Sequence, residues 1–154
     1  MSRSNSTLVI PLTLASALLL APAAWAGLGE GAATIPRDHA ALRGHALQVT
    51  PMQAYDRHEL TTASGTTVHE FASRSGTVFA VSFNGPSLPD LKIMLGSHYD
   101  EYVAAARTRT GNHHVFTIDS PGLVMHIVKM PRGIKGLAHV PALLPSGVAA
   151  RDLR

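Results

Sequence analysis

The stretch that decides the fold is VFAVSFNGPSLPDLKIMLG, residues 78–96. It begins with the alternation of a strand, breaks at a Gly-Pro pair, and continues with apolar residues at helical spacing. Ser87 and Asp90 stand three positions apart, as in a capping box, and Pro89 suits a first helical turn because it lacks an N–H group. We therefore predict a strand, a corner and a helix, with Ser87 as the N-cap and not as a nucleophile.

The residues that lead into this stretch predict an antiparallel meander. Extended runs at 54–61, 66–72 and 77–83 are separated by the loops ASG and RSG. A three-residue loop that ends in glycine is typical of a hairpin whose last loop residue is left-handed. In the second hairpin such a loop sets Phe71 opposite Phe79. One face of the meander would then be apolar and would need a cover. That face carries Phe71, Phe79, Val81 and Phe83.

The helix that starts in the opening stretch is the predicted cover. One face of it has residues at i, i+3, i+4, i+7, i+8 and i+11, which indicates one amphipathic helix to about Arg107. These residues are Leu91, Met94, Leu95, His98, Tyr99 and Tyr102. After it, HHVFTID and LVMHIVKM read as two strands joined by a Pro-Gly turn. Residues 131–136 read as a basic turn and residues 137–140 as a candidate last strand. We predict an α+β fold, in which an antiparallel sheet (a meander plus a second hairpin) carries one main amphipathic helix packed on it.

Four parts are expected along the chain. Residues 1–26 have the pattern of a cleaved signal peptide, because a basic start, an apolar run of about 14 residues and small residues at the cleavage site follow one another. Residues 27–53 read as a flexible segment with a short helical turn and a candidate strand. Residues 54–140 form a single α+β domain, and residues 141–154 form a proline-containing tail. The protein is then expected in the periplasm or outside the cell, without a transmembrane segment once the signal peptide is removed.

Charge and cysteine content narrow the choice of partners. The formal charge is +3 at neutral pH, and it falls to +2 without residues 1–26, which contain one charged residue. A charge this small argues against nucleic acid as a partner. The chain contains no cysteine, so neither a disulfide nor a cysteine nucleophile is available. One candidate partner contact remains, a basic cluster at the turn. It consists of Lys129, Arg132 and Lys135.

Nine histidines make metal binding a chemical alternative. The candidate ligands are His58, Glu59, His69 and Glu70 on the first hairpin, since imidazole and carboxylate groups bind zinc. A three-residue loop sets Glu59 opposite His69 on one face and His58 opposite Glu70 on the other. That register predicts two ion pairs instead of one four-ligand site. The chain also lacks a GxSxG elbow and a glycine-rich phosphate loop, so we predict no catalytic residue and no cofactor.

Several of these motifs together resemble a bacterial family of exported proteins known as domain of unknown function 2844. The likeness rests on Tyr55, SGTTVHEF, SGTVFAVSFNGPSLPDLKIMLGSHY and the late GIKGLAHVPALLPSGV, and it covers nearly all of the chain after residue 26. The family has arginine, tyrosine and tryptophan where this chain has His69, Phe71 and Phe83. The resemblance implies export and one small domain, and it implies no activity or catalytic residue.

The sequence favours a non-enzymatic interaction or binding module of the cell envelope, with another envelope protein as its partner. This interpretation follows from a consistent folding pattern that carries no catalytic or cofactor motif. Three alternatives stay open at this point: a histidine-dependent metal-binding protein, a small hydrolase and a secreted inhibitor.

Overall fold

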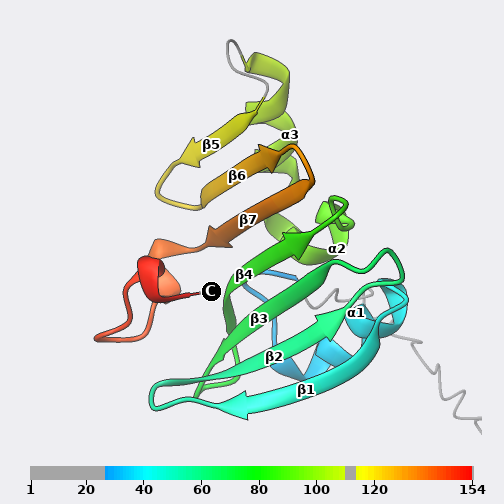
Figure 1. The fold of residues 1–154 in the computed structure, drawn as a ribbon. Helices are drawn as coiled ribbons and strands as arrows, with labels where there is room; N and C mark the ends of the chain where they lie inside the picture. Colours follow the sequence, from blue (N-terminus) through cyan, green and yellow to red (C-terminus); the bar gives the residue numbers. More distant parts are fainter. Residues whose placement is uncertain (1–26, 110–113, 154) are drawn as a thin grey trace, which may run out of the picture.

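The computed structural model describes residues 27–109 and 114–153, so the predicted signal peptide, residues 1–26, lies outside the described residues. Within them, seven strands form one antiparallel sheet in the order β1-β2-β3-β4-β7-β6-β5 (Figure 1). The strands are β1 (His45–Pro51), β2 (Tyr55–Thr61), β3 (Thr67–Ser73), β4 (Val78–Gly85), β5 (Val115–Asp119), β6 (Val124–Met130) and β7 (Gly133–His139). The pairing of β4 with β7 joins two meanders into one sheet. The predicted α+β class with an antiparallel sheet is confirmed.

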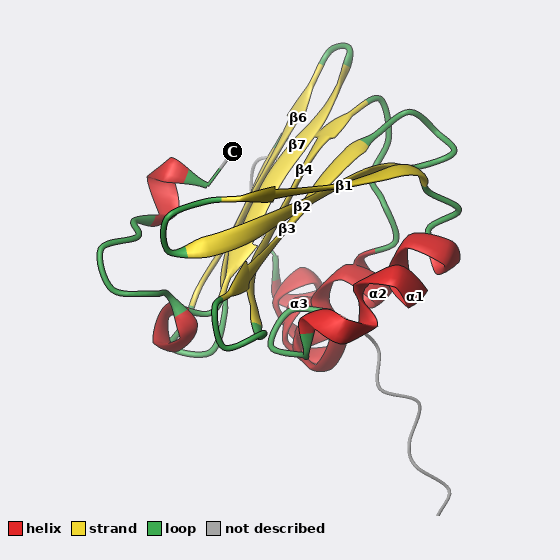
Figure 2. Cartoon of the chain, turned by 90° about the horizontal axis from the view of Figure 1, so that it is seen from below, coloured by secondary structure: helices red, strands yellow, loops and turns green. Residues whose placement is uncertain are grey.

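The α-helices lie along one face of this sheet (Figure 2). They are α1 (Ile35–Ala41), α2 (Leu91–Leu95) and α3 (Tyr99–Thr108), and single 3-10 turns lie at Ala32–Thr34, Gly96–His98, Pro141–Leu143 and Ala150–Asp152. We call the covered side the helix face, which carries Leu60 and Val68, and the other side the open face, which carries Glu59 and Ser82. The main hydrophobic core lies between the helices and the helix face.

The corner after β4 is built differently from the predicted capping box. The N-cap of α2 is Asp90, whose carboxylate accepts hydrogen bonds from the backbone N–H groups of Lys92 at 2.9 Å and Ile93 at 3.4 Å. Ser87 lies three residues before this N-cap, and its carbonyl accepts a 2.7 Å hydrogen bond from the hydroxyl of Thr66, next to β3. The prediction that Ser87 caps the helix is therefore wrong, and Ser87 ties the corner to the first hairpin instead.

Replacing Asp90 with alanine should lower the free energy of unfolding by about 1 kcal/mol, because two N–H groups at the start of α2 lose their acceptor. Asparagine at the same position keeps an acceptor oxygen and should restore most of the stability. Urea denaturation of the three proteins measures both effects. Equal losses with alanine and asparagine would show that the cap hydrogen bonds contribute little.

The single amphipathic helix predicted to about Arg107 is interrupted at Gly96. This residue has φ +51°, a left-handed value that suits glycine, and it separates α2 from the 3-10 turn before α3. A Cβ atom on Gly27 would lie 2.2 Å from the nitrogen of Gly96. The N–H of Leu28 donates a 2.9 Å hydrogen bond to the carbonyl of Met94. The helix is therefore interrupted where the N-terminal backbone crosses it.

Residues 27–53 do not begin with the flexible segment that we predicted. The N–H of Gly29 donates to the carbonyl of Val78 at 2.8 Å, and the N–H of Val78 donates to the carbonyl of Glu30 at 2.9 Å. Leu28 is fully buried in the main core. Within this part of the chain the structure has one short α-helix, α1, and one strand, β1. Backbone groups attach residues 27–30 to β4, so this attachment produces no periodic pattern of side chains in the sequence.

The second hairpin contains an extra residue that changes its faces. The first hairpin has the predicted register. In the second, a bulge next to Phe71 sets this residue opposite Ala80 instead of Phe79. The bulge places Phe71 and Phe79 in a cluster on the open face, whereas Val81 and Phe83 belong to the core under the helices. The prediction of one apolar face that holds all four residues is therefore wrong.

The C-terminal segment packs on the open face. Leu153 is only 2% exposed and joins a cluster with Tyr55, Phe71 and Phe79. The ring of Tyr55 makes edge contacts with both phenylalanine rings, with 5.7 Å between ring centroids in each pair. Residues 141–153, which we predicted as a tail, thus complete a second hydrophobic cluster of the domain.

Strand β7 is longer than predicted. It begins at Gly133, so the basic turn expected at residues 131–136 contains two residues, and the last strand expected at 137–140 starts four residues earlier. The second glycine of residues 131–136, Gly136, lies within the strand, and a Cβ atom added to it would lie 2.4 Å from the ring of Phe83. The absence of a side chain at this glycine leaves space for an aromatic ring in the core. In the sequence alone, the same glycine is interpreted as part of a turn.

Candidate functional site

The open face is hollowed beside the C-terminal segment. A groove of about 670 Å³ lies over the adjacent strands β2, β3, β4, β7 and β6, with the last 3-10 turn at its side. Its polar lining is Glu59, Thr67, His69, Ser82, Asn84, His126, Lys135 and Arg151, and its apolar lining includes Val128, Leu137 and Leu153. We call this space the sheet groove. Its volume falls within the range of about 300 to 1,000 Å³ that is typical of ligand-binding pockets.

The carboxylate in the groove, Glu59, is held by two neighbouring side chains. Its Oε2 lies 3.0 Å from Nε2 of His69, so the predicted cross-strand pair is confirmed. The guanidinium of Arg57, two residues away on the same strand, lies 3.8 Å from the same oxygen. These contacts fix the carboxylate and offset its negative charge.

The rest of the polar lining is basic or neutral. Lys135 of β7 and His126 of β6 are exposed on the open face, and Arg151 extends from the last 3-10 turn. Nε of Arg151 lies 3.9 Å from the carboxylate of Asp152, but both side chains are largely exposed, and such pairs contribute little because water screens them. The groove therefore presents more positive than negative charge.

The four candidate metal ligands do not form one site. Glu59 and His69 lie on the open face, whereas His58 and Glu70 lie opposite each other on the helix face. The ion pair predicted between His58 and Glu70 is not formed, since the described residues contain no ion-pair contact within 4 Å between these two side chains. Over residues 27–109 and 114–153, no group of three or more His, Asp or Glu side chains could hold a metal ion.

Glu70 is instead a fully buried acid. It is 0% exposed, and neither of its carboxylate oxygens has a hydrogen-bond partner among the described residues. Burial raises its pKa to about 8, and the negative charge of Asp38, which is also buried, acts in the same direction. Glu70 is therefore protonated in the native protein at neutral pH.

Burial disfavours the charged form of two histidines that lie outside the groove lining. Desolvation lowers the pKa of His58, against an opposing effect of the nearby Asp56 charge. The pKa of His139, on β7, is lowered by burial alone. Neither histidine is among the residues that line the sheet groove.

The candidate basic cluster is separated by the sheet. Lys135 lies opposite Val128 and lines the sheet groove, whereas Lys129 lies opposite Ile134 and points toward the helix face. Arg132 is exposed in the two-residue turn between these strands. Only Lys135 thus belongs to the candidate site.

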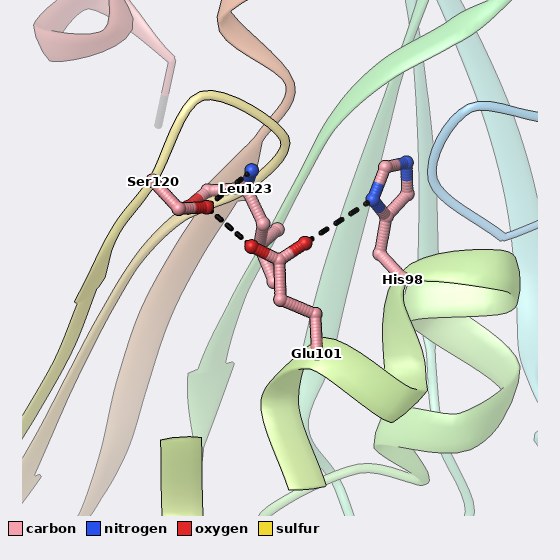
Figure 3. A network of polar contacts seen from close by, with 4 residues as sticks. All are labelled: His98, Glu101, Ser120 and Leu123. Atoms are coloured by element: carbon pink, nitrogen blue, oxygen red, sulfur yellow. Dashed lines mark hydrogen bonds and ion pairs between the residues drawn. The ribbon is translucent and has the colours of Figure 1, made fainter. Parts of the chain in front are cut away.

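A polar network joins α3 to the turn between β5 and β6 (Figure 3). The hydroxyl of Ser120 donates to the carboxylate of Glu101 and accepts a 3.0 Å hydrogen bond from the N–H of Leu123. Nδ1 of His98 lies 3.9 Å from the other carboxylate oxygen. The carboxylate stands between the hydroxyl and the imidazole, so the imidazole cannot take the hydroxyl proton as it does in a hydrolase triad. The network fastens the helix to the sheet and gives no support to the hydrolase alternative.

Sequence reasoning identified Glu59, His69 and Lys135 but missed the other two titratable side chains of the groove. His126 occupies an ordinary outward position of a strand, and only the pairing of β6 with β7 brings it beside Leu137. Arg151 reaches the groove because the C-terminal segment folds back onto the open face. His126 is an ordinary polar residue of a strand, and Arg151 is a basic residue of a predicted tail. Neither has a local sequence pattern that would identify it as part of a site.

The fold and the groove define a class: a small α+β protein with helices on one face of a seven-stranded antiparallel sheet and a polar groove on the other. The family described as protein of unknown function DUF2844 matches residues 24–153, and the chain belongs to this family. No curated protein and no solved structure shows a significant match. None of the helices in the described part of the chain is long and apolar enough to cross a membrane.

Proposed function

We propose that the protein is an exported, non-enzymatic binding module of the cell envelope and that the sheet groove is its binding surface. The observation that supports this most is the contrast between the two faces of the sheet. On the helix face, side chains from α1, α2 and α3 pack into the main core. On the open face, strands and C-terminal segment leave a groove of about 670 Å³ with polar and apolar walls.

The chemistry of the groove favours binding over catalysis. Within the part of the chain that the structure describes, Glu59 is the one carboxylate in its lining, and Arg57 and His69 already hold it. Glycoside hydrolysis generally needs two facing carboxylates, and a zinc centre needs at least three protein ligands. The lining residues suit the recognition of a partner through charge and shape.

The proposal is tested in the organism that makes the protein, with a photo-crosslinking amino acid at His126 or at Lys129. These two residues lie on β6 and project from opposite faces of the sheet. Crosslinking from position 126 should yield one dominant protein adduct, and position 129 should not yield this adduct. The adduct should be found outside the cytoplasm, and its copy of this protein should begin at Gly27, as the signal-peptide prediction requires.

Two results would contradict the proposal. A protein that stays in the cytoplasm with residues 1–26 attached would remove the envelope part. The same adducts from positions 126 and 129 would show that the groove does not select a partner.

A further inference from the structure

We propose that the sheet groove takes up an extended acidic segment of a partner protein, an inference that rests on the function proposed above. The charges of the groove support this class of ligand. Lys135 and Arg151 are exposed cations in its lining, and His69 and His126 add two imidazoles. Complementary charge steers and orients a partner even where it adds little to affinity.

The acid in the lining does not cancel this preference. Glu59 shares one oxygen between His69 at 3.0 Å and Arg57 at 3.8 Å, so its charge is offset within the protein. Lys135 and Arg151, by contrast, extend from two different elements, strand β7 and the last 3-10 turn. A bound carboxylate would therefore meet cations whose charges the rest of the lining does not offset.

The walls of the groove fit an extended chain. Leu137, Val128 and Leu153 supply apolar surface beside the two cations. Thr67 and Ser82 on the sheet supply hydroxyl groups that can donate hydrogen bonds to peptide carbonyls. Side chains of an extended peptide point alternately to its two sides, so acidic residues can contact the cations while apolar ones contact the wall. An acidic segment with interspersed apolar residues satisfies both parts of the lining.

The test uses two synthetic peptides and two charge-matched double variants of this protein. The acidic probe is an acetylated heptapeptide of alternating glutamate and leucine, and the control peptide has glutamine in place of each glutamate. Binding is measured by fluorescence anisotropy at low salt and is located by backbone amide chemical shifts. The groove variant is Lys135→Gln with Arg151→Gln. The control variant is Lys129→Gln with Arg132→Gln, which removes the same charge outside the groove.

We expect the acidic peptide to shift the amide signals of Ser82 and Leu137 and to bind at least about tenfold more tightly than the glutamine peptide. The groove variant should lose about tenfold in affinity, and the control variant should lose less than about twofold. Added salt should weaken binding because the two cations are exposed.

Three outcomes would overturn the inference: equal binding of both peptides, equal losses in both double variants, or shifts confined to residues outside the groove. These results are distinguishable from failure of the proposed function. If position 126 still crosslinks one partner while the acidic peptide does not bind, only the acidic character of the ligand is refuted. If the crosslink is also lost, the groove itself is refuted as the binding surface.

Discussion

Replacing Glu70 with glutamine should raise the free energy of unfolding by about 3 kcal/mol at pH 7, with a gain that grows as the pH rises from about 5 to about 8. Glutamine resembles the protonated acid in shape and charge, so the fold should accept it. The gain arises because the native protein must keep a proton that the unfolded chain releases. Chemical denaturation at a series of pH values measures the effect.

The direction of the pH dependence follows from the two proton affinities of Glu70. Its ordinary pKa of 4.5 applies to the unfolded chain, and burial next to Asp38 raises its pKa to about 8 in the native state. Between these values unfolding releases a proton, so the free energy of unfolding falls by about 1.4 kcal/mol for each pH unit. The stability that the raised pKa of Glu70 contributes is complete below pH 4.5 and is lost by pH 8. Glutamine at position 70 removes this pH dependence. The free energies of unfolding of the variant and of the unchanged protein should therefore become similar at low pH.

Glu59→Gln is the matched control, since Glu59 lies on the neighbouring strand but projects from the opposite face. It removes a partly exposed ion pair and should change stability by less than about 1 kcal/mol, without a gain that grows toward pH 8. The lowered pKa values of His58 and His139 reduce stability as the pH falls below 6.5, and they do so in all three proteins. If the free energy of unfolding of Glu70→Gln and of the unchanged protein depended on pH in the same way, burial would not disfavour the charged form of Glu70.

Local charge and turn chemistry were sufficient to predict the first hairpin. The register that sets Glu59 opposite His69 is the one found, because a shift by one residue would have placed Glu59 against Glu70. In the second hairpin, the pairing next to the turn is the one that a three-residue loop predicts, but the register shifts by one residue at Phe71. A bulge inserts one residue without any charge or glycine to mark it, and its effect on which side chains face the core is visible only in the folded sheet.

The candidate site could be predicted only in part, because it depends on contacts between segments distant in sequence. Glu59 and His69 meet across one hairpin, which short-range rules describe. Glu70 was predicted to pair with His58, yet α1 covers this position and brings Asp38 near it. The sequence pattern of a strand says which residues share a face, but it does not say which segment of the chain will cover that face.

Gly85→Ala should destabilise the protein by about 3 kcal/mol, because the folded chain has no room for an added methyl group at this position. This glycine ends β4 at the corner of the opening stretch. A Cβ atom there would lie 2.4 Å from the Cα of Thr66, a backbone atom that cannot rotate away. Thr66 is itself held, since its N–H donates to the hydroxyl of Thr62 at 3.1 Å and its own hydroxyl donates to the carbonyl of Ser87 at 2.7 Å.

The matched control for this change is Gly31→Ala, measured by the same denaturation curves. Gly31 has φ −76°, which alanine adopts without strain, and the nearest atom to an added Cβ atom lies 4.0 Å away. This change should be neutral or stabilising by about 0.5 kcal/mol, because alanine has less freedom than glycine in the unfolded chain. If both substitutions had the same effect, the close approach at Gly85 would not constrain the corner. A loss confined to Gly85→Ala would show that the Gly-Pro corner is required because two backbones pass there without room for a side chain.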